Sequence, residues 1–272
     1  MQTSVPIHGN YHGYYLKRPS REDPRLALLS SIFAGKRVLD IGCNEGWVTC
    51  EIAQLWCASK VLGVDIDDSL IRGAWRRRRS VWSSQSPGDE TTPVLSVHDT
   101  EERPRKRLRE EPGRSVLNYF PASLEHTFGP LSIPPSQIRG RHAFPHNVSF
   151  RAADWVNNEI LEDKDHYDVV IAFSISKWIH LNGGDDALMR FFHRVHSVLD
   201  TGGVFVLEPQ TWDTYAKAKR MDQRLKENAT NLKLRPHQFE SLLCSIGFGP
   251  AQHLGTTGEG GFCRPVDIYV KL

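Results

Sequence analysis

The sequence lacks any long apolar run: none of its 272 residues falls in a stretch of about 18 apolar positions, the length of a membrane span. Residues 1–8 lack the charged-then-apolar pattern of a secretory signal. Cysteine is scarce, with five residues in an odd count and no CxxC spacing, which argues against a disulfide framework or a zinc site. We therefore expect a protein of a reducing compartment, without membrane contact or bound metal.

Net charge is also low, at +2, and the 39% hydrophobic and 24% charged content is ordinary for a soluble globular protein. Whole-chain charge therefore does not indicate a nucleic-acid binder, and the local distribution must decide. A chain of this length fits one large domain or two small ones. We expect a single domain over 1–272.

One segment, 80–143, is rich in Ser, Pro, Gly and charge. Such a composition cannot bury enough apolar surface to offset the entropy of ordering, so we predict a disordered insertion there. Within it, 103–109 is strongly basic. This stretch reads as a disordered basic patch or as a nuclear-targeting signal.

Outside that segment, strand-like and helix-like patterns alternate, which predicts a doubly wound, Rossmann-like α/β fold with a mostly parallel sheet of seven strands. Apolar runs of strand length lie at 37–41, 60–66, 148–152, 167–173 and 204–208, and a C-terminal antiparallel hairpin is expected from 252–256 and 266–271. Helical periodicity lies at 47–56, 68–79, 185–199 and 236–246.

The turn after the first strand reads Asp40-x-Gly42-x-Asn44-x-Gly46. Small residues here let the backbone approach a ligand, and the following helix offers unpaired N–H groups. Dinucleotide-binding domains carry a related turn, but their spacing is G-x-G-x-x-G. S-adenosylmethionine has no pyrophosphate, and its sulfonium cation suits an acidic strand end such as Asp40. The turn therefore favours S-adenosylmethionine.

Two further acidic positions support this cofactor. Asp65 follows Gly46 at close to the spacing of about 20 residues at which an acid receives ribose hydroxyls, although a helix N-cap is the structural alternative. Asp154, with Trp155, follows the strand 148–152, where an acid could bind the adenine amino group beside an aromatic wall. Together with the turn, these positions predict an S-adenosylmethionine-dependent methyltransferase.

Several motifs resemble the bicoid-interacting-3 family of RNA methyltransferases. They are Asn-Tyr-x-x-Tyr-Tyr at 10–15, the turn at 38–46, Lys-Trp-Ile-His-Leu-Asn at 177–182 and Leu-Glu-Pro-Gln at 207–210. Phe-Pro-Ala-Ser-Leu at 120–124 and Gly-Phe-x-Arg-Pro at 261–265 favour the 7SK-type capping branch over the relative that acts on tRNA 5′-monophosphates. Asp154 and Trp155 depart from the family's usual Asn-Tyr, and Thr211 replaces a proline.

The resemblance implies methyl transfer to the γ-phosphate oxygen at the 5′ end of an RNA polymerase III transcript, which forms a monomethylphosphate cap. It also implies a small non-coding RNA with a 5′-triphosphate as partner, a La-related ribonucleoprotein partner and a nuclear location. Segment 1–34 would form a lid over cofactor and acceptor. The cofactor residues that it implies are Tyr15, Arg25, Gly42, Cys43, Asn44, Asp65, Ile66, Asp154, Trp155 and Phe173. The catalytic residues expected at the acceptor are Tyr14, Lys177 and His180, and those expected to bind RNA or phosphate are Lys17, Arg18, Glu208, Gln210 and Trp212.

The residue types suit this chemistry. A phosphate oxygen is already anionic, so the site mainly has to align it and balance its charge, for which Lys177, Arg18 and Arg25 are suitable. His180, between apolar neighbours, could equally be a core histidine, and Trp178 a packing residue. The other functions considered are an RNA-binding scaffold with dispensable catalysis, and a methyltransferase for RNA 5′-monophosphates or for a small molecule.

Overall fold

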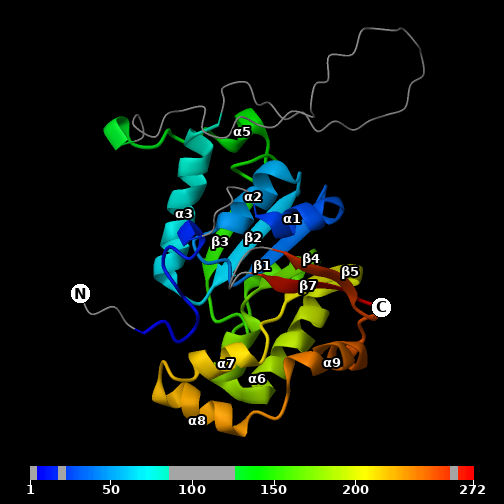
Figure 1. The fold of residues 1–272 in the computed structure, drawn as a ribbon. Helices are drawn as coiled ribbons and strands as arrows, with labels where there is room; N and C mark the ends of the chain where they lie inside the picture. The colour runs from blue at the N-terminus through cyan, green and yellow to red at the C-terminus, as the bar shows by residue number, and fades with distance from the viewer. Residues whose placement is uncertain (1–4, 18–22, 86–125, 258–262) are drawn as a thin grey trace, which may run out of the picture.

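The computed structural model describes residues 5–17, 23–85, 126–257 and 263–272, which form one central sheet with helices on both faces (Figure 1). The sheet has seven strands in the order β3-β2-β1-β4-β5-β7-β6. The strands are β1 Arg37–Ile41, β2 Lys60–Asp65, β3 Val148–Ala152, β4 Tyr167–Phe173, β5 Leu199–Glu208, β6 Gln252–Thr257 and β7 Arg264–Val270.

Strands β1 to β5 pair with one another in parallel, and β7 pairs antiparallel with both β5 and β6. The predicted doubly wound, mostly parallel sheet with a C-terminal hairpin is therefore confirmed. Because β1 leads outward to β2 and β3 while β4 leads outward to β5 on the other side, the strand order reverses between β1 and β4. In open α/β sheets, ligands bind at the carboxyl ends of the strands at such a point.

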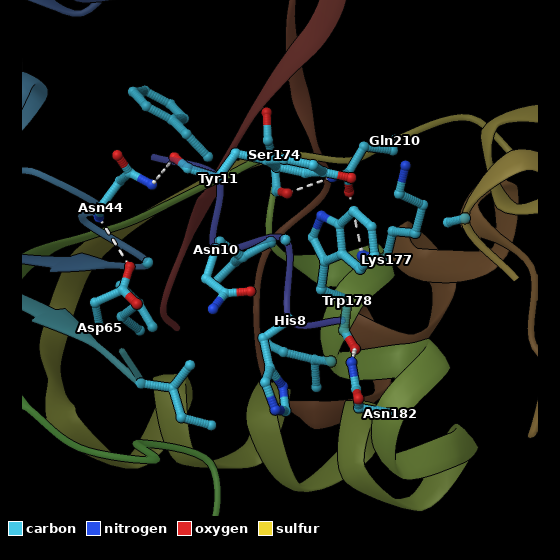
Figure 2. A pocket seen from close by; sticks show the side chains of 18 of the residues that line it. His8, Asn10, Tyr11, Asn44, Asp65, Ser174, Lys177, Trp178, Asn182 and Gln210 are labelled. Carbon is cyan, nitrogen blue, oxygen red and sulfur yellow. Dashed lines mark hydrogen bonds between the residues drawn. The ribbon is translucent and has the colours of Figure 1, made fainter. Parts of the chain in front are cut away.

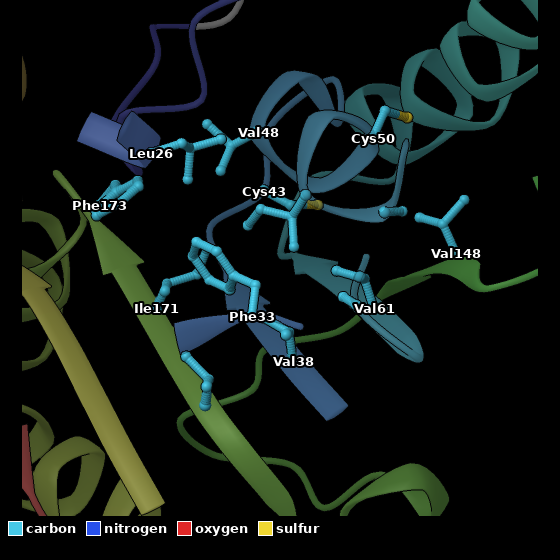
Figure 3. Close-up of a cluster of buried hydrophobic side chains, with 14 of the residues drawn as sticks. Leu26, Phe33, Val38, Cys43, Val48, Cys50, Val61, Val148, Ile171 and Phe173 are labelled. Carbon is cyan, nitrogen blue, oxygen red and sulfur yellow. The ribbon is translucent and has the colours of Figure 1, made fainter. Parts of the chain in front are cut away.

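Two apolar layers hold the helices against the sheet, because successive strand residues face opposite sides. On one face, Val38 packs with side chains from α1 (Pro24–Leu28), α2 (Trp47–Leu55) and α3 (Asp68–Ser83), as Figure 3 shows in part. On the other face, Leu39 packs with side chains from α6 (Ser176–Val198) and α9 (Phe239–Ile246). Each fully buried Leu, Val or Phe contributes about 1.5–3 kcal/mol to the free energy of folding.

Helix α6 differs from the prediction, which placed its start at 185. It begins at Ser176, and Gly184, with φ 72° and ψ −172°, marks a kink where two helices join. Two more helices that the sequence pattern did not predict, α7 (Asp213–Ala218) and α8 (Gln223–Asn231), follow β5. Both are short and polar, and each buries few side chains, so no apolar stripe announced them.

Both ends of the segment 80–143, for which disorder was expected, are part of the described structure. Helix α3 continues to Ser83, beyond its predicted end at 79. The chain after 126 lies along this helix: Arg79 Nη2 donates a hydrogen bond to Pro130 O at 3.1 Å, and Trp82 Nε1 donates one to Ser132 O at 3.1 Å. A short helix, α5 (Ser136–Arg139), follows. The basic stretch 103–109 lies outside the described residues, and the expectation for it stays a prediction.

Among the residues that the structure describes, no helix combines the length and the apolar character that a membrane crossing requires.

Candidate active site

A cavity of about 600 Å³ opens at the carboxyl edge of the parallel strands, where β1 and β4 adjoin (Figure 2). This volume is in the range of small-molecule and cofactor sites. The predicted site residues that line it are Tyr14, Tyr15, Gly42, Asn44, Asp65, Ile66, Asp154, Trp155, Phe173, Lys177 and Gln210. Predicted site residues that are described but do not line it are Arg25, Asp40, Cys43, Gly46, His180, Glu208 and Trp212.

The turn after β1 is shaped by left-handed backbone and close packing. Gly42 has φ 79°, and a Cβ there would lie 2.1 Å from Ile175 Cγ2, so only glycine fits. Asn44 also has a positive φ, 51°, and its Nδ2 donates a hydrogen bond to Tyr11 O at 3.1 Å. Its Oδ1 is buried without a hydrogen-bond partner among the described residues. A ligand in the cavity that carries an N–H or O–H donor would satisfy this oxygen.

Asp65 closes the same end of the cavity from the end of β2. Its Oδ2 accepts a hydrogen bond from Asn44 N at 2.8 Å, and its Oδ1 accepts one from Asp67 N at 3.0 Å. Burial raises the pKa of this carboxyl to about 6, and the two backbone donors oppose the rise. Because each carboxylate oxygen can accept a second hydrogen bond, Asp65 can hold the turn and still receive two ligand hydroxyls.

Three residues at the turn for which a cofactor contact was predicted, Asp40, Cys43 and Gly46, do not line the cavity. Asp40 accepts a hydrogen bond from Thr49 Oγ1 at 2.6 Å, and burial raises its pKa to about 7. Cys43 is buried in the core on the α2 side, where burial raises the pKa of its thiol. Gly46, at φ 73°, leaves no room for a Cβ because the Phe150 ring would lie 2.8 Å away. These residues set the shape of the turn.

The far end of the cofactor half combines an apolar surface with an acid. Ile66 is 42% exposed although it is large and apolar, and it lines the cavity together with Asp154 and Trp155. Asp154 accepts a hydrogen bond from Asn157 Nδ2 at 2.8 Å. The Trp155 ring is buried in the core, where its Nε1 donates a hydrogen bond to Asp163 Oδ2 at 3.1 Å. An apolar platform beside a carboxylate suits a planar ring with an amino group.

The N-terminal segment 8–15 lines the cavity and runs from one of its walls to the other (Figure 2). Asn10 Nδ2 donates a hydrogen bond to Asp67 Oδ2 at 2.6 Å, next to β2. On the opposite wall, Asn182 Nδ2 in α6 donates one to Ile7 O at 2.8 Å. Gly9, at φ 74°, packs against Trp178 so closely that a Cβ would lie 2.2 Å from its Nε1. The segment therefore contacts both walls of the cavity, and the lid predicted for 1–34 stays a prediction.

Beneath the cavity, Arg25 and Glu208 form an ion pair in the protein interior. Arg25 is 1% exposed and Glu208 is fully buried. The guanidinium donates hydrogen bonds to Glu208 and to Asp23, with Nε 2.8 Å from Asp23 Oδ1, and it lies 4.0 Å from the centroid of the Phe173 ring. These residues lie beneath the cavity floor and do not line the cavity, and the cofactor contact predicted for Arg25 and the phosphate contact predicted for Glu208 stay predictions.

The turn between β4 and α6 holds a strained residue at the cavity surface. Ser174 has φ 62°, a conformation that non-glycine residues rarely adopt. Its Oγ donates a hydrogen bond to Glu208 Oε2 at 2.9 Å, and Gln210 Nε2 bonds to its carbonyl oxygen. Gln210 Oε1 also accepts a hydrogen bond from Lys177 N at 3.1 Å. Gln210 therefore holds the turn in place as a clamp, through hydrogen bonds to two of its backbone groups. The sequence predicted a phosphate contact for Gln210 and did not predict this structural role.

Lys177 brings positive charge to this end of the cavity. Its side chain is 8% exposed, and its Nζ lies 3.4 Å from Thr214 Oγ1 and 5.0 Å from the Trp178 ring centroid. Burial, and then the charge of Arg264, lowers the pKa of this ammonium to about 8. The group therefore remains mostly protonated at neutral pH and is poorly hydrated, as a strong anion-binding group should be.

Two predicted acceptor residues are packed elsewhere. His180 is fully buried and is hydrogen-bonded to Tyr215 OH at 3.2 Å and to Asp185 Oδ1 at 2.7 Å, so it matches the core-histidine alternative. Trp212 lies outside the cavity beneath the Arg235 guanidinium, 3.9 Å from the ring centroid. Arg18 and the side chain of Lys17 lie outside the described residues.

Sequence reasoning missed part of the acceptor wall. Asp213, Thr214, Lys217 and Arg264 line the cavity, together with Ser174. Arg264 belongs to the motif at 261–265, but the sequence predicted no function for it. The helix that carries Asp213 and Lys217 has no apolar pattern, so nothing local in the sequence marks these side chains as neighbours of Lys177.

Comparison with known proteins identifies relatives along nearly the whole chain. The family model described as Bicoid-interacting protein 3 (Bin3) matches residues 167–271. A 7SK snRNA methylphosphate capping enzyme of Mus musculus is 37% identical over 97% of this chain, and the chain spans 40% of that protein's length. A probable RNA methyltransferase of Arabidopsis thaliana is 34% identical over 96% of this chain and 79% of its own length. A U6 snRNA methylphosphate capping enzyme of Drosophila melanogaster is 29% identical over 97% of this chain and 74% of its own length.

The solved structure of the N-methyltransferase NodS from Bradyrhizobium japonicum, in complex with S-adenosyl-L-homocysteine, matches 99% of this chain and 93% of its own, with a TM-score of 0.53 at 12% identity. The likeness at this identity concerns the fold. The class I methyltransferase fold and the family predicted from the sequence are therefore confirmed, and the findings agree with the predicted S-adenosylmethionine cofactor.

Proposed function

The chain belongs to the bicoid-interacting protein 3 family of RNA methyltransferases, and from this premise we propose that it methylates the 5′ γ-phosphate of a small nuclear RNA with S-adenosylmethionine. The proposal rests on one observation: a surface suited to a nucleoside and a surface rich in positive charge line the same cavity. A turn and carboxylate suited to a nucleoside adjoin a wall with the cations Lys177, Lys217 and Arg264. A small neutral acceptor would have no use for such a wall.

The cofactor fits the donor half on physical grounds. The unpartnered Asn44 Oδ1 lines the cavity, and so does Asn10, whose Oδ1 is also buried without a partner among the described residues. Asp65 can accept ribose hydroxyls, and Ile66 offers a face for adenine. When bound, S-adenosylmethionine supplies an electrophilic methyl group on a sulfonium. Gly42 allows the backbone to approach it closely.

The chain's own residues have a positioning task at the acceptor. A phosphate oxygen is anionic at neutral pH and attacks the methyl carbon as the carbon–sulfur bond breaks, so no side chain has to remove a proton. Positive and negative charge cancel in this reaction, so binding the phosphate too tightly would slow it. Lys177 and the hydroxyl of Tyr14 can instead hold the oxygen in line with the methyl group. Burial beneath segment 8–15 excludes water from that line.

The proposal extends to the RNA and its compartment. The mouse and fly relatives are named for 7SK and U6 snRNA, so a small nuclear RNA with a 5′-triphosphate is the proposed partner and the nucleus the proposed compartment. A La-related partner protein stays a prediction from the sequence.

The test is methyl transfer by the purified chain to one small nuclear RNA prepared with a 5′-triphosphate, a 5′-monophosphate or a 5′-hydroxyl. We expect one methyl group per RNA on the terminal phosphate of the triphosphate form, identified by mass after nuclease digestion. Equal methylation of the three forms would remove the phosphate as acceptor. Preference for the monophosphate would assign the chain to the other RNA substrate considered above. Binding without any methylation would favour the scaffold function.

A further inference from the structure

Three cations meet at the acceptor end of the cavity, and they lie at different depths. Arg264, at the start of β7, is half-buried, and its Nη1 donates a hydrogen bond to Ser174 Oγ on the floor. Lys177 is 8% exposed. Lys217 is exposed and lines the same cavity as Lys177. The cations therefore form a series in which Lys177 and Arg264 are the inner members and Lys217 lies at the rim (Figure 2 shows Ser174 and Lys177).

Helix α7 presents the outer part of this series. Asp213, Thr214, Lys217 and Ala218 all line the cavity. Their spacing of one, four and five positions places them on one face of a helix. The Lys217 ammonium makes no hydrogen bond or ion pair with any described residue, so it is available to a ligand. Thr214 Oγ1, by contrast, is 3.4 Å from Lys177 Nζ and donates to Thr211 O at 2.7 Å.

We propose that Arg264 and Lys177 bind the inner phosphates of an RNA 5′-triphosphate, and that Lys217 at the rim binds a further phosphate and so distinguishes a triphosphate end from a monophosphate end. The inference rests on the proposed function and adds to it the residue that makes binding depend on the number of 5′ phosphates. One phosphate reaches only the inner cations, because Lys217 lies at the exposed edge. A longer chain of phosphates extends past Lys177 to the rim.

Charge balance supports this assignment. Among the described residues that line this end of the cavity, the two lysines face a single carboxylate, Asp213, whereas Arg264 contacts Ser174, whose hydroxyl is bonded to the buried Glu208. The surplus of positive charge matches a polyphosphate better than the single carboxylate of a methionine tail. Arg264 also presents a planar fork that suits phosphate oxygens, whereas the lysines act as point charges on flexible stems. A flexible rim lysine tolerates different RNA sequences, since it contacts only phosphate.

The test compares binding of one short RNA carrying a 5′-triphosphate, 5′-diphosphate or 5′-monophosphate, measured in the presence of S-adenosylhomocysteine. Lys217→Gln is expected to weaken triphosphate binding about tenfold, as loss of one charge-assisted contact should. It should leave monophosphate binding unchanged. Lys219→Gln is the matched control, because Lys219 is an exposed lysine two positions away that does not line the cavity. It should leave all three affinities unchanged.

A second variant predicts an effect of opposite sign. Asp213→Asn removes the carboxylate that faces the cations, so triphosphate binding should tighten severalfold while the amide keeps the size of the side chain. Equal loss for all three RNA forms in Lys217→Gln would overturn the proposal, since it would mean contact with the RNA body. A loss of S-adenosylhomocysteine affinity in that variant would also overturn it, by assigning the cations to the cofactor. If wild-type protein does not methylate triphosphate RNA at all, the proposed function fails instead, and the binding ratios still report on Lys217.

Discussion

The two halves of the cavity are built in different ways. The donor half centres on a short stretch of chain, in which the turn at Gly42 and Asn44 is tied to Asp65 by one hydrogen bond from the backbone. The acceptor half is assembled from separate elements, with Lys177 on α6, Lys217 on α7 and Arg264 on β7. The donor half is acidic and backbone-rich, whereas the acceptor half is cationic and made of side chains.

The two halves differ because their ligands have different requirements. A nucleoside is recognised by close approach and by hydrogen bonds, which a glycine turn and one carboxylate can provide. A polyphosphate is recognised by charge over a longer distance, which needs cations from several elements. Cations that converge repel one another, so they need a rigid support. The buried Arg25–Glu208 pair and the Gln210 clamp beneath Ser174 provide it.

The largest effect is expected from removing that support. Glu208→Ala leaves the Arg25 charge buried with only Asp23 as its carboxylate partner and frees the strained turn at Ser174. We expect a loss of about 3–5 kcal/mol in the free energy of unfolding, measured by urea denaturation. The triple variant Asp23→Asn, Arg25→Met, Glu208→Leu removes all three buried charges and should recover much of this loss. If Glu208→Ala is as stable as wild type, Glu208 does not support the floor. The phosphate contact predicted for it from the sequence would then be the favoured role.

The donor half is tested by Asp65→Ala. The variant leaves the Asn44 and Asp67 backbone donors without their acceptor and removes the ribose contact. Each loss is worth about 1–3 kcal/mol, so S-adenosylhomocysteine binding should weaken about a hundredfold by calorimetry. Asp68→Asn, in which an exposed carboxylate nearby is neutralised, serves as the control and should bind normally. Normal binding by Asp65→Ala would mean that the residue is only the helix-end acid considered as its alternative.

The sequence predicted the donor half well because it depends on local structure. The turn geometry follows from glycines at Gly42 and Gly46, and the strand ends that carry Asp65 and Asp154 follow from apolar runs. The sheet was predicted for the same reason, since parallel strands buried on both faces read as continuous apolar segments. The resemblance added Lys177 and Gln210, which do line the cavity.

The acceptor half was harder to predict because its residues meet only through tertiary packing. Motif membership placed His180 and Glu208 at the acceptor, but both are buried and paired inside the protein. Lys217 lies on a six-residue polar helix that no periodicity marks. Sequence can say that a side chain belongs to a motif, but the direction in which it points is set by the packing of its helix.

The two halves should also lose ligand binding in opposite pH directions, the donor half as the pH falls and the acceptor half as it rises. The Asp65 carboxyl has a pKa near 6, so cofactor binding should weaken as the pH falls below that value and the acid becomes neutral. Lys177 has a pKa near 8, so kcat/KM for RNA should fall as the pH rises above it and the charge that faces the phosphate is lost. Bound phosphate favours the charged form, so the fall in kcat should come at higher pH than the fall in kcat/KM. Lys177→Arg, which stays charged, should abolish the basic limb. A basic limb unchanged in this variant would mean that another group titrates there.

The smallest effect is expected at His180, which separates support of the acceptor half from direct contact with the substrate. Burial lowers the pKa of this imidazole, so it is neutral at pH 7 and cannot add charge at the phosphate. Its hydrogen bonds join Tyr215 of α7 to Asp185 of α6. His180→Gln should therefore lower the free energy of unfolding by about 1–2 kcal/mol and raise KM for RNA modestly, through loosening of the helix that carries Lys217. It should leave kcat at saturating RNA and the pH profile of Lys177 unchanged. A large fall in kcat with normal stability would instead place His180 among the groups that contact the reacting atoms. The acceptor half would then contain a neutral hydrogen-bonding group as well as its three cations.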